Sequence, residues 1–177
     1  MPTEPTSKRS APLIERFAMG PAILAYAVAN LDLEQERARP GPGAWSITEL
    51  VHHLVDTDLV YAERMKRVIA EENPVLQNFD ENAWCDRLSY NLGSVEEAVN
   101  LLAANRRWML PILRRCSDAD FARAGTHTER GRLTLAELLA TMANHVDHHL
   151  RFLYVKRANL GVALPPRYAS EAIEAMG

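Results

Sequence analysis

Two histidines, His145 and His149, lie one helical turn apart in the apolar stripe of a helix predicted over residues 133–154. Imidazoles at positions i and i+4 can bind the same metal ion, because one turn separates their Cβ atoms by only about 5–6 Å. His148 falls on a polar row and is expected to face solvent. The pair alone does not decide between a metal site and two hydrogen-bonded core histidines, because this HxxxH pattern lacks the glutamate of HExxH. The stripe is completed by Leu135, Leu138, Met142 and Phe152.

A third inward histidine is predicted on another helix, which begins after Ser46 and runs to about residue 70. Ser46 and Glu49 have the spacing of a capping box. Helical periodicity places His53 on the inward side of this helix and His52 on a solvated row. Three neutral imidazoles leave one coordination position open, which is typical of catalytic metal sites. The open position could hold water or a thiolate; the alternative is three histidines that pack in the core or share a bridging water.

Two segments resemble the DinB/YfiT-like family. Trp45–Asp56, WSITELVHHLVD, is similar to the family pattern WSI-x-E-(I/L)-x-x-HL-x-D, and residues 131–135 followed by His145-x-x-His148-His149-Leu150 are similar to its closing segment. The resemblance extends more loosely over residues 12–160. It implies a four-helix bundle, a divalent metal on His53, His145 and His149, and frequent homodimers. The family includes metal-dependent hydrolases and thiol S-transferases.

Composition and charge limit the function classes. The chain has 177 residues, 47% of them hydrophobic, and a formal net charge of −3. It is therefore long enough for one domain with a substantial core. The mixed charge gives no basic stripe for nucleic acid, and we expect no membrane span and no signal peptide. Cys85 and Cys116 do not form a disulfide framework, so we expect a reducing, cytoplasmic setting.

The hydrophobic pattern predicts an all-α protein, an antiparallel four-helix bundle without strands. The expected helices cover residues 12–33, 47–70, 94–116 and 133–160, and the first is interrupted at Gly20-Pro21 as a kink or a break. Residues 71–92 and 118–132 are predicted to be long loops. The expected domain limits are a disordered tail over 1–10, the bundle over 11–160, and a C-terminal tail over 161–177 that could hold one short helix.

Four other residues have side chains that could serve a functional role. His127 is expected in a loop that could overhang the site. Asp56 is expected in a solvated ion pair, with orientation of a ligand as the alternative, and Asp58 is expected to be buried and hydrogen-bonded. Arg106 is expected in an ion pair on the helix surface, with binding of a substrate carboxylate as the alternative.

The function predicted from sequence is a metal-dependent S-transferase that uses a small thiol, with a metal-dependent hydrolase as the alternative. A non-catalytic metal-binding or stress-response dimer, and a helical protein without metal, are the other candidates. The cofactor is expected to be divalent Zn, Ni, Fe or Mn. Expected partners are a small-molecule substrate, in particular a low-molecular-weight thiol, and a second copy of the chain. Because free imidazole titrates near about pH 6.5, metal release is expected through roughly pH 6 to 5.

Overall fold

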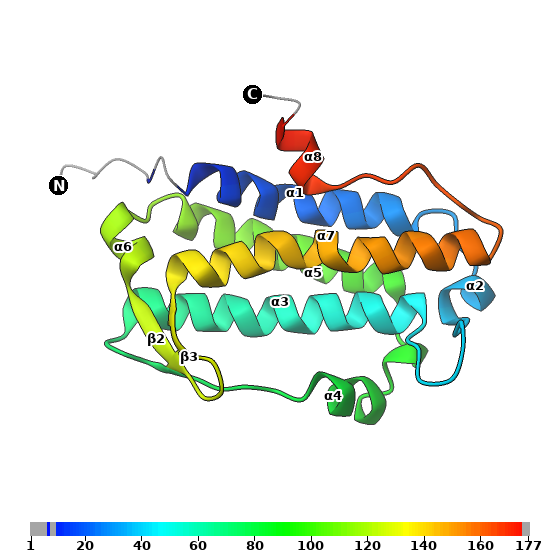
Figure 1. Cartoon of the computed structure of the whole chain (residues 1–177), viewed down its shortest axis with the longest axis horizontal. Helices are drawn as coiled ribbons and strands as arrows, with labels where there is room; N and C mark the ends of the chain where they lie inside the picture. Colours follow the sequence, from blue (N-terminus) through cyan, green and yellow to red (C-terminus); the bar gives the residue numbers. More distant parts are fainter. Residues whose placement is uncertain (1–6, 8–9, 175–177) are drawn as a thin grey trace.

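Four long helices form a bundle in the computed structural model, which describes Ser7 and residues 10–174 (Figure 1). They are α1 (Ala11–Val28), α3 (Ile47–Ala70), α5 (Val95–Leu113) and α7 (Leu135–Asn159). Both α1 and α3 pack against α5 and α7. The chain direction in Figure 1 shows that α3 and α7 are antiparallel, whereas α1 and α7 run the same way. The prediction of an all-α four-helix bundle is confirmed.

Side-chain caps begin three of the long helices, and the capping box predicted for Ser46 and Glu49 is confirmed. Ser46 before α3 and Thr134 before α7 each form a complete capping box, with Glu49 and Glu137 respectively. Ser94 accepts a hydrogen bond from the backbone of Glu97 at the start of α5. These side chains satisfy backbone donors that have no partner within the helix.

The connections contain more structure than the sequence predicts. Residues 71–92 hold β1 (Val75–Leu76), α4 (Glu81–Arg87) and the 3-10 helix η1 (Tyr90–Leu92), and residues 118–134 hold α6 (Asp118–Ala122), β2 (Ala124–His127) and β3 (Gly131–Thr134). β2 pairs in parallel with β1 and antiparallel with β3. The prediction of no strand is therefore wrong. Strands of two to four residues are too short to show alternation, and β1 meets β2 only through long-range pairing.

Two further short helices lie near the ends of the bundle. α2 (Leu33–Arg37) follows α1, and α8 (Ala169–Glu174) confirms the predicted short C-terminal helix. Asp147 of α7 accepts hydrogen bonds from the backbone N–H groups of Ala169 and Ser170, which holds α8 against the bundle. The predicted tail over residues 1–10 lies outside the described residues except for Ser7 and Ser10, which are both buried.

The connection from α3 to α5 returns along the length of α3 (Figure 1). This return lets α3 and α5 run in parallel, and it lays α4 across α3. Within the connection, the rings of Phe79 and Trp84 stack with centroids 4.8 Å apart, and Cys85 of α4 is buried. A segment expected to be a loop is therefore a packed part of the protein that carries side chains to α3.

The buried hydrophobic residues form two clusters. A buried ion pair lies between them. Arg106 of α5 and Asp58 of α3 are each 1% exposed, and Nη2 of Arg106 lies 2.7 Å from Oδ2 of Asp58. Arg106 also donates to the carbonyl oxygens of Phe17 in α1 at 2.8 Å and Met142 in α7 at 3.2 Å. The prediction for Asp58 is confirmed. The surface position predicted for Arg106 is wrong, because this side chain links all four long helices.

The Gly20-Pro21 pair makes room for Arg106. α1 is one continuous helix with Pro21 inside it, not two helices. Proline has no N–H, so the carbonyl of Phe17 four residues earlier lacks its usual helical donor, and Nη1 of Arg106 donates to that oxygen. A Cβ atom on Gly20 would lie 2.3 Å from the same Nη1. The Gly20-Pro21 pair, which the sequence predicts to interrupt the helix, therefore leaves space on α1 for the guanidinium of Arg106.

α1 is also long and apolar enough to cross a membrane, judged by length and composition alone. The sequence analysis expected no such segment. In the structure α1 packs against α5 and α7 and contributes Phe17 and Leu24, which are fully buried, to the core. A core helix of a bundle and a membrane span share this composition.

The buried ion pair leads to a stability prediction. Asp58→Ala should lower the free energy of unfolding by about 3–5 kcal/mol, because it leaves the Arg106 charge buried without a partner. Denaturant unfolding of the purified variant measures this. The control is Glu63→Ala, which removes an exposed ion pair with Arg67 and should leave stability nearly unchanged. Equal effects of the two substitutions would contradict the structural role of Asp58 and Arg106.

Candidate metal centre

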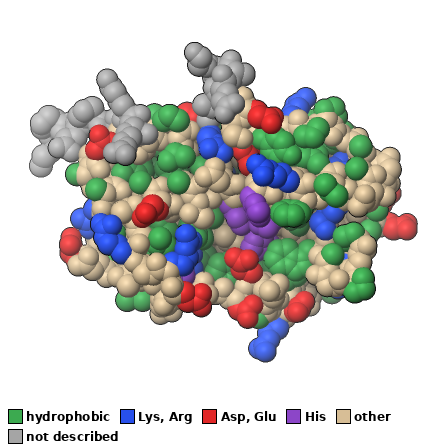
Figure 2. All heavy atoms as spheres, in the orientation of Figure 1, with side chains coloured by type: hydrophobic (Ala, Val, Ile, Leu, Met, Phe, Trp, Pro, Cys, Tyr) green, Lys and Arg blue, Asp and Glu red, His purple; other side chains and the backbone are tan. Residues whose placement is uncertain are grey.

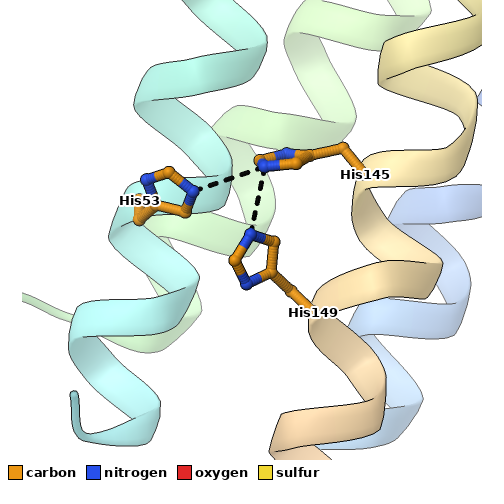
Figure 3. A group of neighbouring side chains, drawn as sticks. All are labelled: His53, His145 and His149. Carbon is orange, nitrogen blue, oxygen red and sulfur yellow. Dashed lines mark hydrogen bonds between the residues drawn. The ribbon is translucent and has the colours of Figure 1, made fainter. Parts of the chain in front are cut away.

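The three predicted histidines converge at one point between α3 and α7 (Figure 3). Nε2 of His145 lies 3.3 Å from Nε2 of His53 and 3.1 Å from Nε2 of His149. One ring nitrogen from each residue falls within 4.8 Å of the others. The structure therefore brings His53, His145 and His149 together, as the sequence predicts.

Two of the three nitrogen separations suit a single divalent cation. Metal–nitrogen bonds of about 2.0–2.1 Å at a tetrahedral angle place the nitrogens roughly 3.3–3.4 Å apart. The separations of His145 from His149 and from His53, 3.1 and 3.3 Å, are close to this value, whereas His53 and His149 lie only within 4.8 Å of each other and would have to move closer around a bound ion. The three residues that converge here are all histidines, and a donor set of imidazoles suits zinc, nickel and other divalent transition metals.

Burial keeps the three rings neutral. It lowers the pKa of His53 to about 4, of His145 to about 2 and of His149 to about 3. The neighbouring imidazoles add to the shift for His145, as does the Arg106 guanidinium. A neutral imidazole has the lone pair that a metal requires. At neutral pH all three side chains are therefore in the form that binds a cation.

His53 is held by contacts on both sides of its ring. It is 2% exposed, and the ring of Trp45 covers it with a centroid separation of 4.9 Å. Oγ1 of Thr57, one turn further along α3, lies 3.4 Å from Nδ1 of His53. A metal on Nε2 would leave the proton on Nδ1, where it can be donated to Thr57. These contacts set the orientation of the ring.

A carboxylate that the sequence analysis missed also lies at the cluster. Oε2 of Glu81 is 4.0 Å from Nε2 of His53. Asp80 caps α4 by accepting from the backbone of Ala83, which makes Glu81 the first residue of the helix. Burial raises the pKa of Glu81, opposed by Arg64 and aided by Asp80. In the sequence, the length of the connection over residues 71–92 is the one signal of a functional role for this segment, because long ordered loops are often functional.

The cluster opens onto the surface beside a pocket of about 290 Å³. Figure 2 shows histidine side chains at the surface near the middle of this face. Phe152 was predicted in the apolar stripe with the core residues of α7, but it is 52% exposed and lines this pocket. A larger pocket of about 690 Å³ near Trp84 includes none of the three histidines. The smaller pocket is the one that a substrate of the cluster would use.

The other candidate residues lie outside the cluster. His148 is exposed, as predicted. His52 is half-buried, with Nδ1 2.9 Å from the carbonyl oxygen of Thr48. His127 was expected in a loop, but it lies in β2, is buried, and accepts hydrogen bonds at Nδ1 from the backbone of Glu129 and Arg130.

Asp56 is half-buried and accepts a hydrogen bond from the hydroxyl of Tyr90. It is therefore held by a packing contact with η1, and the solvated ion pair predicted for it is absent from the described residues. A carboxylate in this arrangement anchors the connection to α3 and orients no histidine of the cluster.

Comparison with known proteins gives consistent results. The family model of the DinB superfamily matches residues 16–153. A protein of Oceanobacillus iheyensis named "putative metal-dependent hydrolase" is 34% identical over 131 residues, which are 73% of this chain and 75% of that protein. A protein of Bacillus mycoides with the same description is 29% identical over 140 residues, 79% of this chain and 80% of its own length.

A solved structure has the same fold. YfiT from Bacillus subtilis, described as "a probable metal-dependent hydrolase with an unusual four-helix bundle topology", superposes with a TM-score of 0.82. It is 26% identical in sequence, and the match covers 91% of this chain and 93% of YfiT.

The geometry of the cluster predicts which histidines bind metal. Alanine at His53, His145 or His149 should remove most bound metal, because each substitution deletes one of three donors. The control is His148→Ala, which changes an exposed histidine on the same helix. Metal content is measured by mass spectrometry after loading and dialysis, with circular dichroism to verify the fold. Metal loss in His148→Ala with retention in His149→Ala would contradict the assignment.

The lowered pKa values of the three histidines lower the pH at which we expect metal release. A proton competes with the metal for each Nε2, and rings with pKa values of about 4, 2 and 3 stay neutral in far more acid than free imidazole. Metal occupancy should therefore remain near its neutral value to about pH 5 and fall only below it, lower than the sequence alone suggests. Dialysis over a pH series, with the helical signal followed in parallel, measures the release. A midpoint near pH 6 in folded protein would show that burial does not hold the rings neutral.

Proposed function

Because this chain belongs to the DinB superfamily, we propose that it is a metal-dependent hydrolase with its metal bound by His53, His145 and His149. Two kinds of evidence support the proposal. Relatives that match three quarters of the chain are named metal-dependent hydrolases, though only as putative ones. The observation that carries the proposal is the convergence of three neutral imidazoles at one point, with the Glu81 carboxylate beside them.

The chain's own residues supply the remaining chemistry of hydrolysis. When bound, a divalent cation lowers the pKa of water and polarises a carbonyl or phosphoryl group. Glu81 accepts the proton that the water loses as its oxygen attacks the substrate, and returns that proton to the leaving group as the scissile bond breaks. The side chain of Glu81 is 51% exposed, and partial burial raises its pKa, which favours acceptance of the proton.

Surrounding residues keep this arrangement in place. The tilted ring of Trp45 packs against His53, and Thr57 orients the histidine ring through Nδ1. The exposed side of the cluster faces the pocket next to His149, so substrate can approach from solvent. A small ester or amide fits a pocket of about 290 Å³.

Thiol-dependent transfer, the function favoured by the sequence analysis, is the second candidate. Three neutral ligands leave the full charge of a divalent cation at the site, which favours binding of an anion such as a thiolate. The names of the relatives favour water as the nucleophile. Titration of the cobalt-loaded protein with small thiols distinguishes the two, since sulfur ligation adds a charge-transfer band.

The hydrolase proposal predicts distinct roles for Glu81 and His149. Protein loaded with Zn²⁺, Ni²⁺, Mn²⁺ or Fe²⁺ should hydrolyse members of a panel of small esters and amides, and a chelator or His149→Ala should abolish turnover. Glu81→Gln should lower kcat by about 10²–10⁴-fold while metal content stays unchanged, because glutamine cannot accept the proton.

The matched control is Asp86→Asn, which removes an exposed carboxylate from the same helix and should leave kcat unaltered. Loss of metal from Glu81→Gln would make Glu81 a ligand and overturn its role as base. If no metal supports turnover of any substrate, the protein is a metal-binding protein without hydrolase activity.

A further inference from the structure

The pocket beside His149 combines aromatic walls with a single cation. Trp45 and Phe152 line it, and the side chain of Phe152 is 52% exposed. Lys156 lies at the far end from His149, seven residues further along α7. The pocket thus runs along two turns of one helix, from the histidine cluster to an ammonium group.

Lys156 has no acidic partner among the described residues. Its Nζ donates to the backbone carbonyl of Trp45, and no carboxylate lies within ion-pair distance of it. Glu49 is the acidic side chain whose charge attracts Lys156. Its carboxylate is already bound by Arg39 and by the backbone N–H of Ser46. Of the three donors on the ammonium, one is used by the protein, and the others are left for water or a ligand.

The environment makes a bound anion favourable at Lys156. The side chain is half-buried, and burial lowers its pKa. A cation that is partly removed from water and has no carboxylate within ion-pair distance gains more from an anion than an exposed one does. The opposite charge of an incoming ligand would replace the solvation that Lys156 has lost.

We propose that Lys156 binds an anionic group of the substrate and thereby selects acidic small molecules for the metal centre. The inference rests on the proposed function, because the other end of the substrate must reach the histidine cluster. The aromatic side chains of Trp45 and Phe152 contact the apolar part between the two ends. The substrate class is a small ester or amide with an apolar linker and a terminal carboxylate or phosphate.

The helix gives a scale for such a molecule. Seven residues at about 1.5 Å each place the backbones of His149 and Lys156 roughly 10 Å apart along α7. An extended chain of about eight carbon atoms has a length of this order.

The test uses two probes that differ only at one end. Suberic acid monohydroxamate carries a metal-binding hydroxamate and a carboxylate, whereas octanohydroxamate carries the same hydroxamate and a methyl group. Calorimetric titration of the metal-loaded protein should show about tenfold tighter binding of the carboxylate probe, the gain expected from a charge-assisted hydrogen bond. Lys156→Met should abolish this preference and leave the binding of octanohydroxamate unchanged.

The matched control is Lys66→Met, which removes an exposed lysine toward the other end of α3 and should retain the tenfold preference. Equal binding of the two probes by the unaltered protein would overturn the role of Lys156 while the metal proposal stands. A preference that persists in Lys156→Met would also overturn it, and phosphonate-ended probes in the same series identify which anion is preferred. If neither hydroxamate binds the loaded protein, the metal centre itself is wrong.

Discussion

The buried ion pair of Arg106 and Asp58 is the interaction on which the bundle depends. A guanidinium inside a helical core needs a counter-charge and acceptors for its remaining donors. Asp58 of α3 supplies the charge, and the carbonyl oxygens of Phe17 and Met142 supply acceptors on α1 and α7. The acceptor on α1 is free because Pro21 lacks an N–H, and Gly20 leaves the space. One side chain therefore sets how all four long helices lie relative to each other.

The contacts of Arg106 also help to position the histidine cluster. Asp58 follows His53 on α3, and Met142 precedes His145 on α7, so the contacts of Arg106 fix the two helices whose histidines must meet. The positive charge of Arg106 also disfavours a proton on His145, in addition to the larger effect of burial. Structural and chemical requirements thus agree: the core holds the imidazoles close together and keeps them neutral, as ligands of a cation must be.

The groups that would give the centre its reactivity and selectivity come from outside the helical core. Glu81 is carried by the connection that returns along α3, Trp45 by the segment before α3, and Lys156 by the last turns of α7. Trp45 and Lys156 line the pocket beside His149, and Glu81 contacts His53 from the neighbouring helix α4. This arrangement is consistent with a rigid bundle that holds the metal ligands and with surrounding segments that select the substrate. The exposed ring of Phe152 belongs to this outer set, although its spacing resembles that of a core residue.

The sequence by itself determined the four helices, their caps, and the inward position of His53, His145 and His149. These features follow from spacings of three and four residues within single helices, and such spacings are local. It also placed Asp58 in the core, from the same periodicity. Only the tertiary structure decided that Arg106 is buried, that short strands form in the connections, that Glu81 lies beside His53, and that Lys156 lines the same pocket as His149. Each of these depends on where residues distant in the sequence meet, and a helical pattern defines the face on which a side chain lies but not the partner that it will contact.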